Sequence, residues 1–254
     1  MQHHTLYKAV NLLIVLVFPF LWGCGSDDDD SISKPGTYSV TAGVGVSAND
    51  ILSDKVFKSL VVEVAYMPGM KLSTNTVNEV KAFFESRTHK GKGIQILERE
   101  IPSMNKAVYT ATDIRNWEKE YRTTKPSGDK LSIWVCVVDG EYDNSGVVGI
   151  AYQNLSCALM GKTIADNSGG LTQPTKTKIE TTIFLHEIGH LLGLVDIGSP
   201  MVKNHSAHGN HCDNENCLMY YAVENTDFFS VLGSSPVPSL DANCLNDLKA
   251  NGGK

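Results

Sequence analysis

The chain reads His186-Glu187-Ile188-Gly189-His190 in its second half, and this stretch decides how the rest is interpreted. On a helix, residues four positions apart share one face, so His186 and His190 are expected to direct their imidazole nitrogens at one metal ion. Glu187 lies one position along, where its carboxylate can reach a water molecule without ligating the metal. Zinc with histidine ligands and an open position lowers the pKa of such a water, and Glu187 can take its proton. The stretch therefore predicts a zinc-dependent hydrolytic site.

The helix expected around this stretch covers residues 174–194, with Pro174 near its start and Gly193 near its end. An apolar stripe on it is expected to dock the helix into the core, and its members are Phe184, Ile188, Leu191 and Leu192. A core helix with two hydrogen-bonded histidines is the alternative interpretation of the bare motif. Gly193 favours the metal site, because a glycine with positive φ can end the helix and turn the chain back towards the metal.

Beyond Gly193 the sequence contains a methionine turn, Cys217-Leu218-Met219-Tyr220-Tyr221. The histidine motif followed by such a turn resembles the metzincin zinc proteases, and His211-Cys212 before the turn is most similar to the archaemetzincins. The resemblance implies an α/β (α+β) metzincin-like zincin fold: a mixed twisted sheet, a zinc-binding active-site helix, the Met-turn with Met219 beneath the metal, and a small C-terminal subdomain. It also implies a zinc endopeptidase that acts on a peptide or protein substrate.

The third zinc ligand has four candidates, which are Asp196, His205, His208 and His211. Asp196 has the standard spacing after the helix, and snapalysin-type metzincins use an aspartate there. His211 keeps the archaemetzincin spacing to Met219, with the extra residues placed upstream as a loop insertion. Because histidine is the commoner third ligand, His211 is favoured and Asp196 is the alternative. His205 ranks behind both, and His208 is interpreted as a solvated loop residue.

The resemblance implies roles for two further parts of the site. Tyr221, two residues after Met219, is expected to stabilise the developing oxyanion, as in the astacins and serralysins; a tyrosine packed under the site would explain it equally well. Residues 149–152 fall where metzincins keep the edge strand that pairs with extended substrates, although an inward-packed strand fits too. Archaemetzincins also bind a structural zinc through four cysteines. This chain lacks their later Cys-x-x-Cys, so a single catalytic zinc ion is expected.

A surface binding or adhesion module that retains a zinc site without turnover is the alternative function. Loss of Glu187 or of a histidine would have favoured it, and all three residues of the motif are present. The formal net charge of −6 is mildly acidic, and it does not indicate nucleic-acid binding. The protein is expected to act as a monomer.

Residues 1–23 are interpreted as a lipoprotein signal peptide. An apolar run follows Lys8, and Leu21-Trp22-Gly23-Cys24 resembles a bacterial lipobox in which Cys24 receives the lipid; an ordinary secretory signal is the alternative. Residues 24–58 are expected to form an acidic, flexible tether, because the carboxylates of Asp27 to Asp30 repel one another. Such an acidic start resembles the surface-export signal of Bacteroidetes lipoproteins. We therefore expect an outer-membrane lipoprotein exposed on the cell surface, or otherwise on the periplasmic face, with the lipid as its only membrane contact.

Residues 59–254 are expected to form the catalytic domain. Strands are predicted over 60–66, 94–101, 131–138, 146–152 and 156–160, and helices over 75–87, 113–122 and 174–194. This alternation predicts an α/β sheet layer with the last helix beneath it. Five cysteines remain beside Cys24, namely Cys136, Cys157, Cys212, Cys217 and Cys244. Cys212 and Cys217 are close enough in sequence to form a disulfide, and no pairing is assigned.

Overall fold

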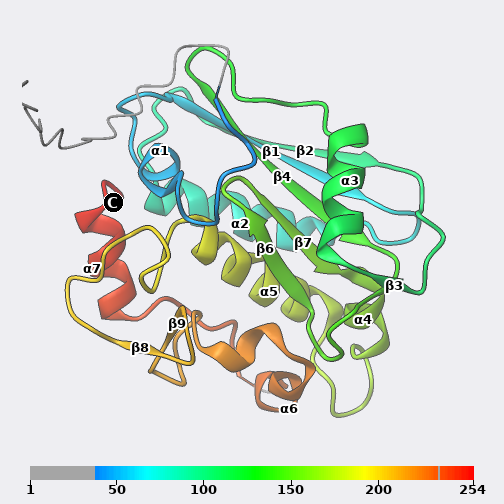
Figure 1. Cartoon of the computed structure of the whole chain (residues 1–254). Helices are drawn as coiled ribbons and strands as arrows, with labels where there is room; N and C mark the ends of the chain where they lie inside the picture. The colour runs from blue at the N-terminus through cyan, green and yellow to red at the C-terminus, as the bar shows by residue number, and fades with distance from the viewer. Residues whose placement is uncertain (1–37, 234) are drawn as a thin grey trace, which may run out of the picture. The chain divides into compact units, whose positions relative to one another are not determined.

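A computed structural model of the chain describes residues 38–233 and 235–254 (Figure 1). The expected signal peptide, the lipid-attachment residue Cys24 and the acidic run after it lie outside the described residues. None of the described helices has both the length and the apolar character that a membrane crossing requires.

A five-stranded sheet lies at the centre of the fold. Its strands are β1 (Ser59–Tyr66), β2 (Ile94–Glu100), β4 (Lys130–Val138), β6 (Gly149–Gln153) and β7 (Ser156–Met160). The order is β2-β1-β4-β7-β6, in which the first four strands run parallel and β6 runs antiparallel to β7. Parallel strands covered on both faces need nearly continuous apolar runs, which explains the unbroken burial of β4 after its first residue. The antiparallel strand β6 forms one edge of the sheet.

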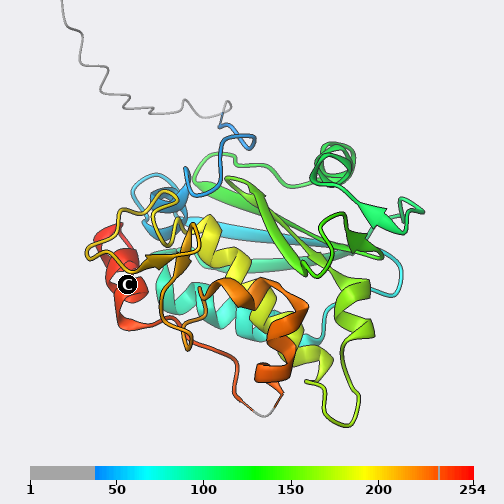
Figure 2. The same cartoon turned by 60° about the horizontal axis from the view of Figure 1, so that its bottom comes forward.

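Helices cover both faces of this sheet (Figures 1 and 2). The helices α2 (Thr74–Arg87) and α5 (Lys176–Leu191) pack together under one face, and α3 (Ala111–Tyr121) covers the other. Each face has its own apolar cluster. Phe84 and Ile183 belong to the cluster on the α2 and α5 side, while Ile114 and Trp134 belong to the cluster under α3. The short elements α4 (Gly161–Asp166), β3 (Val108–Tyr109) and β5 (Glu141–Tyr142) lie beside this frame.

The folded domain begins before residue 59, where the sequence placed its boundary. Residues 38–58 are packed against the domain and include the helix α1 (Ala48–Leu52). Ile51 and Leu52 are fully buried in the same cluster as α5. The expectation of a flexible tether over 24–58 is therefore wrong for residues 38–58, because their apolar side chains complete the core.

A small C-terminal portion follows α5 and lies along that helix (Figure 2). Its elements are β8 (Ser206–Ala207), β9 (His211–Cys212), η1 (Tyr221–Glu224), η2 (Thr226–Phe228), α6 (Phe229–Leu232) and α7 (Ala242–Ala250). The end of α7 meets α1, where the side-chain amide of Asn49 donates to the carbonyl of Asn251 at 2.8 Å. A mixed twisted sheet, a long helix beneath it and a small C-terminal portion confirm the predicted fold class.

Candidate active site

The helix α5 presents the histidine motif and ends where the sequence requires it to end. Thr175 caps its first turn by accepting a hydrogen bond from the backbone N–H of Lys178 at 3.2 Å. Gly193 follows the helix with φ of +75°, and a Cβ at this position would lie 2.5 Å from the backbone nitrogen of Ser199. Only glycine fits such a crowded left-handed position, so Gly193 ends the helix and turns the chain as predicted.

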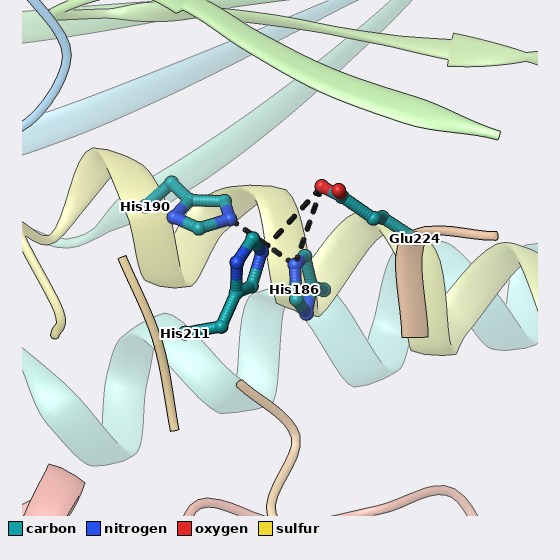
Figure 3. A group of neighbouring side chains, drawn as sticks. All are labelled: His186, His190, His211 and Glu224. Atoms are coloured by element: carbon teal, nitrogen blue, oxygen red, sulfur yellow. Dashed lines mark hydrogen bonds and ion pairs between the residues drawn. The ribbon is translucent and has the colours of Figure 1, made fainter. Parts of the chain in front are cut away.

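Four side chains from three elements, α5, β9 and η1, meet at this helix (Figure 3). One donor atom each from His186, His190, His211 and Glu224 lies within 4.8 Å of the others. The Nε2 atoms of His186 and His190 are 3.1 Å apart, close to the roughly 3.3 Å that separates two nitrogens bound to one tetrahedral zinc. His211 reaches the group from β9. Asp196 does not belong to the group.

Hydrogen bonds orient two of these rings. The Nδ1 of His186 lies 2.7 Å from the carbonyl of Leu218, and a carbonyl can only accept, so this nitrogen carries the proton. The Nδ1 of His211 makes the same kind of bond to the carbonyl of His208 at 3.1 Å. In both rings Nε2 therefore faces the group with a free lone pair, which is the arrangement that metal-binding histidines need.

The environment keeps the helix histidines neutral. Burial lowers the pKa of His186 to about 4 and places the pKa of His190 well below its usual range. Burial would also lower the pKa of His211, but the nearby carboxylate of Glu224, 3.6 Å from its Nε2, raises it overall. Neutral imidazoles are the form that binds zinc.

Several buried polar atoms at the site lack a partner within the protein. They are His190 Nδ1, His211 Nε2 and both carboxylate oxygens of Glu187. Leaving such atoms without a partner is costly, and native proteins rarely do so without a functional reason. Three imidazole nitrogens facing one point suit zinc, which prefers nitrogen and sulfur donors in a tetrahedral arrangement. The residues present therefore fit a zinc ion.

Glu187 lies on the side of the helix that faces the sheet. It is fully buried, and a Cβ at Gly149 of β6 would lie 2.4 Å from its Oε1 atom. The absence of a side chain at Gly149 thus makes the space for this carboxylate. Burial, and then the charge of Glu224, raise the pKa of Glu187 well above its ordinary value. A carboxylate with a raised pKa can both accept and return a proton near neutral pH.

Met219 packs directly against the helix between the two histidines. A Cβ at Gly189 would lie only 2.2 Å from its Sδ atom, so the pair fits together because residue 189 is a glycine. The carbonyl of Met219 accepts a hydrogen bond from the backbone N–H of Cys212 at 2.7 Å. The methionine turn and the strand that carries His211 are thereby fixed to each other.

Asp196 and His205 are not members of this group, and Tyr221 packs on the loop residue His208. Asp196 is exposed and adopts a left-handed conformation with φ of 62°. Tyr221 is half-buried, and its ring packs on that of His208 with centroids 4.0 Å apart. His205 is buried elsewhere, with its Nε2 2.8 Å from a carboxylate oxygen of Asp247.

Glu224 is the member of the group that the sequence did not reveal. Its Oε2 atom lies 3.6 Å from His211 Nε2 and 3.9 Å from His186 Nε2. Its backbone carbonyl accepts the N–H of Val148 at 2.8 Å, which ties η1 to the start of the edge strand. Partial burial raises the pKa of this carboxyl, but the nearby histidines lower it overall, so it is ionised at neutral pH. No local spacing pattern marks it, because it reaches the site only through the turn after Met219.

Comparisons with known proteins place this geometry in context. The family model Reprolysin_5, described as metallo-peptidase family M12, matches residues 70–230. Among solved structures, the archaemetzincin from Methanopyrus kandleri is similar to this chain with a TM-score of 0.49 and 16% identity, over 77% of this chain and 95% of that one. Metalloproteinase-II from Bacteroides fragilis is similar with a TM-score of 0.41 and 16% identity, over 79% of this chain and 56% of that one. A search of curated proteins finds no match.

Proposed function

The chain belongs to metallo-peptidase family M12 and is a zinc metallopeptidase, and from this premise we propose that it cleaves internal peptide bonds with Glu187 as the general base. Three residues are proposed to hold the zinc: His186 and His190 from α5, and His211 from β9. One observation carries the proposal. Three imidazoles face one point beside a buried carboxylate whose oxygens have no partner within the protein.

Several side chains and backbone groups of the protein are proposed to take part in hydrolysis. Zinc, when bound, polarises the scissile carbonyl and lowers the pKa of the attacking water. Glu187 takes the proton of that water and returns it to the leaving amine, a sequence that its raised pKa supports. Leu218 and His208 hold the tautomers of two zinc-binding rings through their carbonyls. Tyr221 is proposed to stabilise the oxyanion. For this role its ring must move away from the ring of His208, on which it packs, or tilt relative to it.

The edge strand β6 is proposed to bind the substrate backbone. It is the last strand of the sheet, and Gly149 at its start lies against Glu187. An extended peptide that pairs with β6 would run past the zinc-binding helix, with main-chain hydrogen bonds supplying sequence-independent affinity. This arrangement favours an endopeptidase, because a peptide can continue along the strand in both directions.

Replacement of Glu187 by alanine tests the mechanism. Activity on an unfolded protein substrate is expected to fall by about two to four orders of magnitude, while zinc content and the unfolding midpoint stay close to those of the parent. Glu79→Ala, at an exposed position on α2, is the control and should cleave like the parent. Near-normal proteolysis by the Glu187 variant would rule out its role as the base. Zinc binding without any chelator-sensitive cleavage by the parent would favour the binding-module alternative.

The location of the protein is proposed from the sequence alone. Cys24 follows a lipobox-like stretch, so the full chain is proposed to be lipid-anchored in the outer membrane and exposed on the cell surface. Cys24→Ala should release the protein from membranes or leave it unprocessed, as judged by fractionation of expressing cells. Failure of a labelled fatty acid to attach to the parent chain would exclude the anchor.

A further inference from the structure

We propose that Glu224 is a fourth protein ligand of the catalytic zinc and closes the site until substrate binds. The inference deepens the proposed function and rests on it, because it takes the ion held by His186, His190 and His211 as its starting point. Three imidazoles leave one position of a tetrahedral zinc open. The carboxylate of Glu224, which comes from η1, belongs to the same group of donors and faces the imidazoles (Figure 3).

One oxygen atom of Glu224 lies at nearly the distances expected of a ligand. Its Oε2 is 3.6 Å from Nε2 of His211 and 3.9 Å from Nε2 of His186. Zinc bonds of about 2.0–2.1 Å to nitrogen and oxygen separate two ligands of a tetrahedral site by roughly 3.4 Å. Both distances lie within about half an ångström of that value, so a single oxygen of Glu224 suits the fourth position.

Hydrogen bonding does not explain why this oxygen approaches the imidazoles. The Nδ1 atoms of His186 and His211 donate to backbone carbonyls, so their Nε2 atoms present lone pairs. The distances from these Nε2 atoms to Oε2 of Glu224 are longer than a hydrogen bond. Two lone pairs and a carboxylate oxygen that face one another repel, and a cation placed between them removes the repulsion.

An ion pair between Glu224 and a protonated His211 is the competing explanation. It needs a proton on His211 Nε2 that points at the carboxylate, and at 3.6 Å the two atoms are too far apart for that hydrogen bond. It also leaves the lone pair of His186 Nε2 facing the same oxygen. A zinc ion meets neither objection, because all four donors share it.

Glu224 lies where its side chain can move away from the metal. The side chain is 28% exposed, whereas that of His186 is fully buried. The main chain around it is held to the segment before β6: the carbonyl of Glu224 accepts the N–H of Val148 at 2.8 Å, and the N–H of Thr226 donates to the carbonyl of Gly146 at 2.9 Å. The carboxylate can therefore turn towards solvent while the main chain of η1 stays in place.

A fourth protein ligand makes the resting site closed. It occupies the position that the attacking water and the scissile carbonyl need. A peptide that pairs with β6 and continues to Val148 would compete for the N–H that the carbonyl of Glu224 accepts. Binding of a substrate along the edge strand would thereby loosen Glu224, so that hydrolysis begins only with a peptide in place.

Binding of imidazole to the cobalt(II)-loaded full chain tests the proposal. Glu224→Gln keeps the size of the side chain but replaces the carboxylate by an amide, which is not among the usual zinc ligands. If Glu224 occupies the fourth position about nine-tenths of the time or more, this change should tighten imidazole binding by about tenfold or more. The cobalt absorption is followed during titration at about pH 8.5, where imidazole is mainly neutral.

Three further variants complete the experiment. Asp227→Asn removes the same charge at an exposed position three residues along the chain, and it should bind imidazole like the parent. Glu224→Ala, which removes the side chain altogether, should tighten binding as Glu224→Gln does. His190→Ala lacks the histidine group, so its spectrum gives the background from cobalt bound elsewhere.

Equal or weaker imidazole binding by Glu224→Gln would overturn the fourth ligand. A carboxylate that only lies near the metal leaves the position open, does not repel a neutral probe and can accept its N–H. Failure of the proposed function is distinguishable, because the parent would then lack chelator-sensitive proteolysis while Glu224→Gln still binds imidazole more tightly. Equal cobalt content in the parent and His190→Ala would place the metal outside the histidine group and overturn both.

Discussion

At the scale of single residues, Gly189 shows how closely the zinc-binding helix and the methionine turn are fitted. Replacement by alanine would place a methyl group in the space that Met219 Sδ fills, because the added Cβ would lie 2.2 Å from that sulfur. Overpacking of a well-packed core costs about 1–3 kcal/mol. We expect Gly189→Ala to lower the urea midpoint and to weaken zinc binding. The control Gly91→Ala, at a position where an added Cβ meets nothing within 4 Å, should leave both unchanged; equal behaviour of the two variants would contradict the prediction.

His211 and Asp196 can be separated by zinc titration. The proposed assignment predicts that His211→Ala loses more zinc affinity than the ten- to hundredfold typical of residues that only support a ligand. Asp196→Gly should bind zinc like the parent. It should also be at least as stable, because glycine adopts the φ of 62° at little cost and the aspartate there is exposed. The reverse pattern would move the third ligand to Asp196.

At the scale of an element, the start of α3 provides a test by pH. Thr110 and Asp113 form a reciprocal capping box with distances of 3.1 Å and 3.0 Å, and Lys106 donates to the same carboxylate. The Lys106 hydrogen bond, followed by those from Thr110, lowers the pKa of Asp113 to about 2. Because this pKa lies below its unfolded value of about 3.9, the stabilisation is present above pH 4 and is lost as the pH falls towards 2.

Asp113→Ala should therefore cost about 1 kcal/mol at pH 7, and the difference from the parent should shrink towards pH 2. Urea denaturation in the presence of chelator measures this difference without a contribution from metal loss. Glu79→Ala serves as the exposed control. A difference that stays constant from pH 7 to pH 2 would show that the carboxylate charge contributes nothing.

The longer elements could be predicted from the sequence because their patterns are local. The predicted helices over 75–87 and 174–194 correspond to α2 and α5, and the predicted strand over 131–138 to β4. The strand predicted from residue 146 begins at Gly149 instead, because Val147 and Val148 bond to the segment around Glu224. The five-residue helix α1 was missed, since so short a helix is held by tertiary burial and has no periodic signal of its own.

At the scale of the whole molecule, some residues of the candidate site are close together in sequence, and others are brought to it only by the fold. His186, Glu187 and His190 are fixed by helical spacing, so the sequence alone could group them. His211 could only be chosen from four candidates, because the inserted segment between Gly193 and His211 has no sequence pattern that fixes its path. Glu224 had no signal, since its approach depends on how η1 packs on α5. Arg122 shows the same limit: it follows the last residue of α3 and forms a buried ion pair with Glu118 at 2.6 Å, which the predicted helix over 113–122 did not reveal.

The contact between α1 and the end of α7 has a consequence for the order of folding. Asn49 and Asn251 are 202 positions apart in the chain. A contact that spans nearly the whole domain forms late, because most of the intervening chain must be ordered before the two ends meet. This contact between α1 and the end of α7 is therefore expected to form last during folding. It is also expected to be among the first regions to open in the native protein. Since Asp247 of α7 accepts the N–H of Val202 and contacts His205, opening of this contact is expected to release the inserted loop as well, so that amide protons of α1, α7 and that loop exchange with solvent before those of α5.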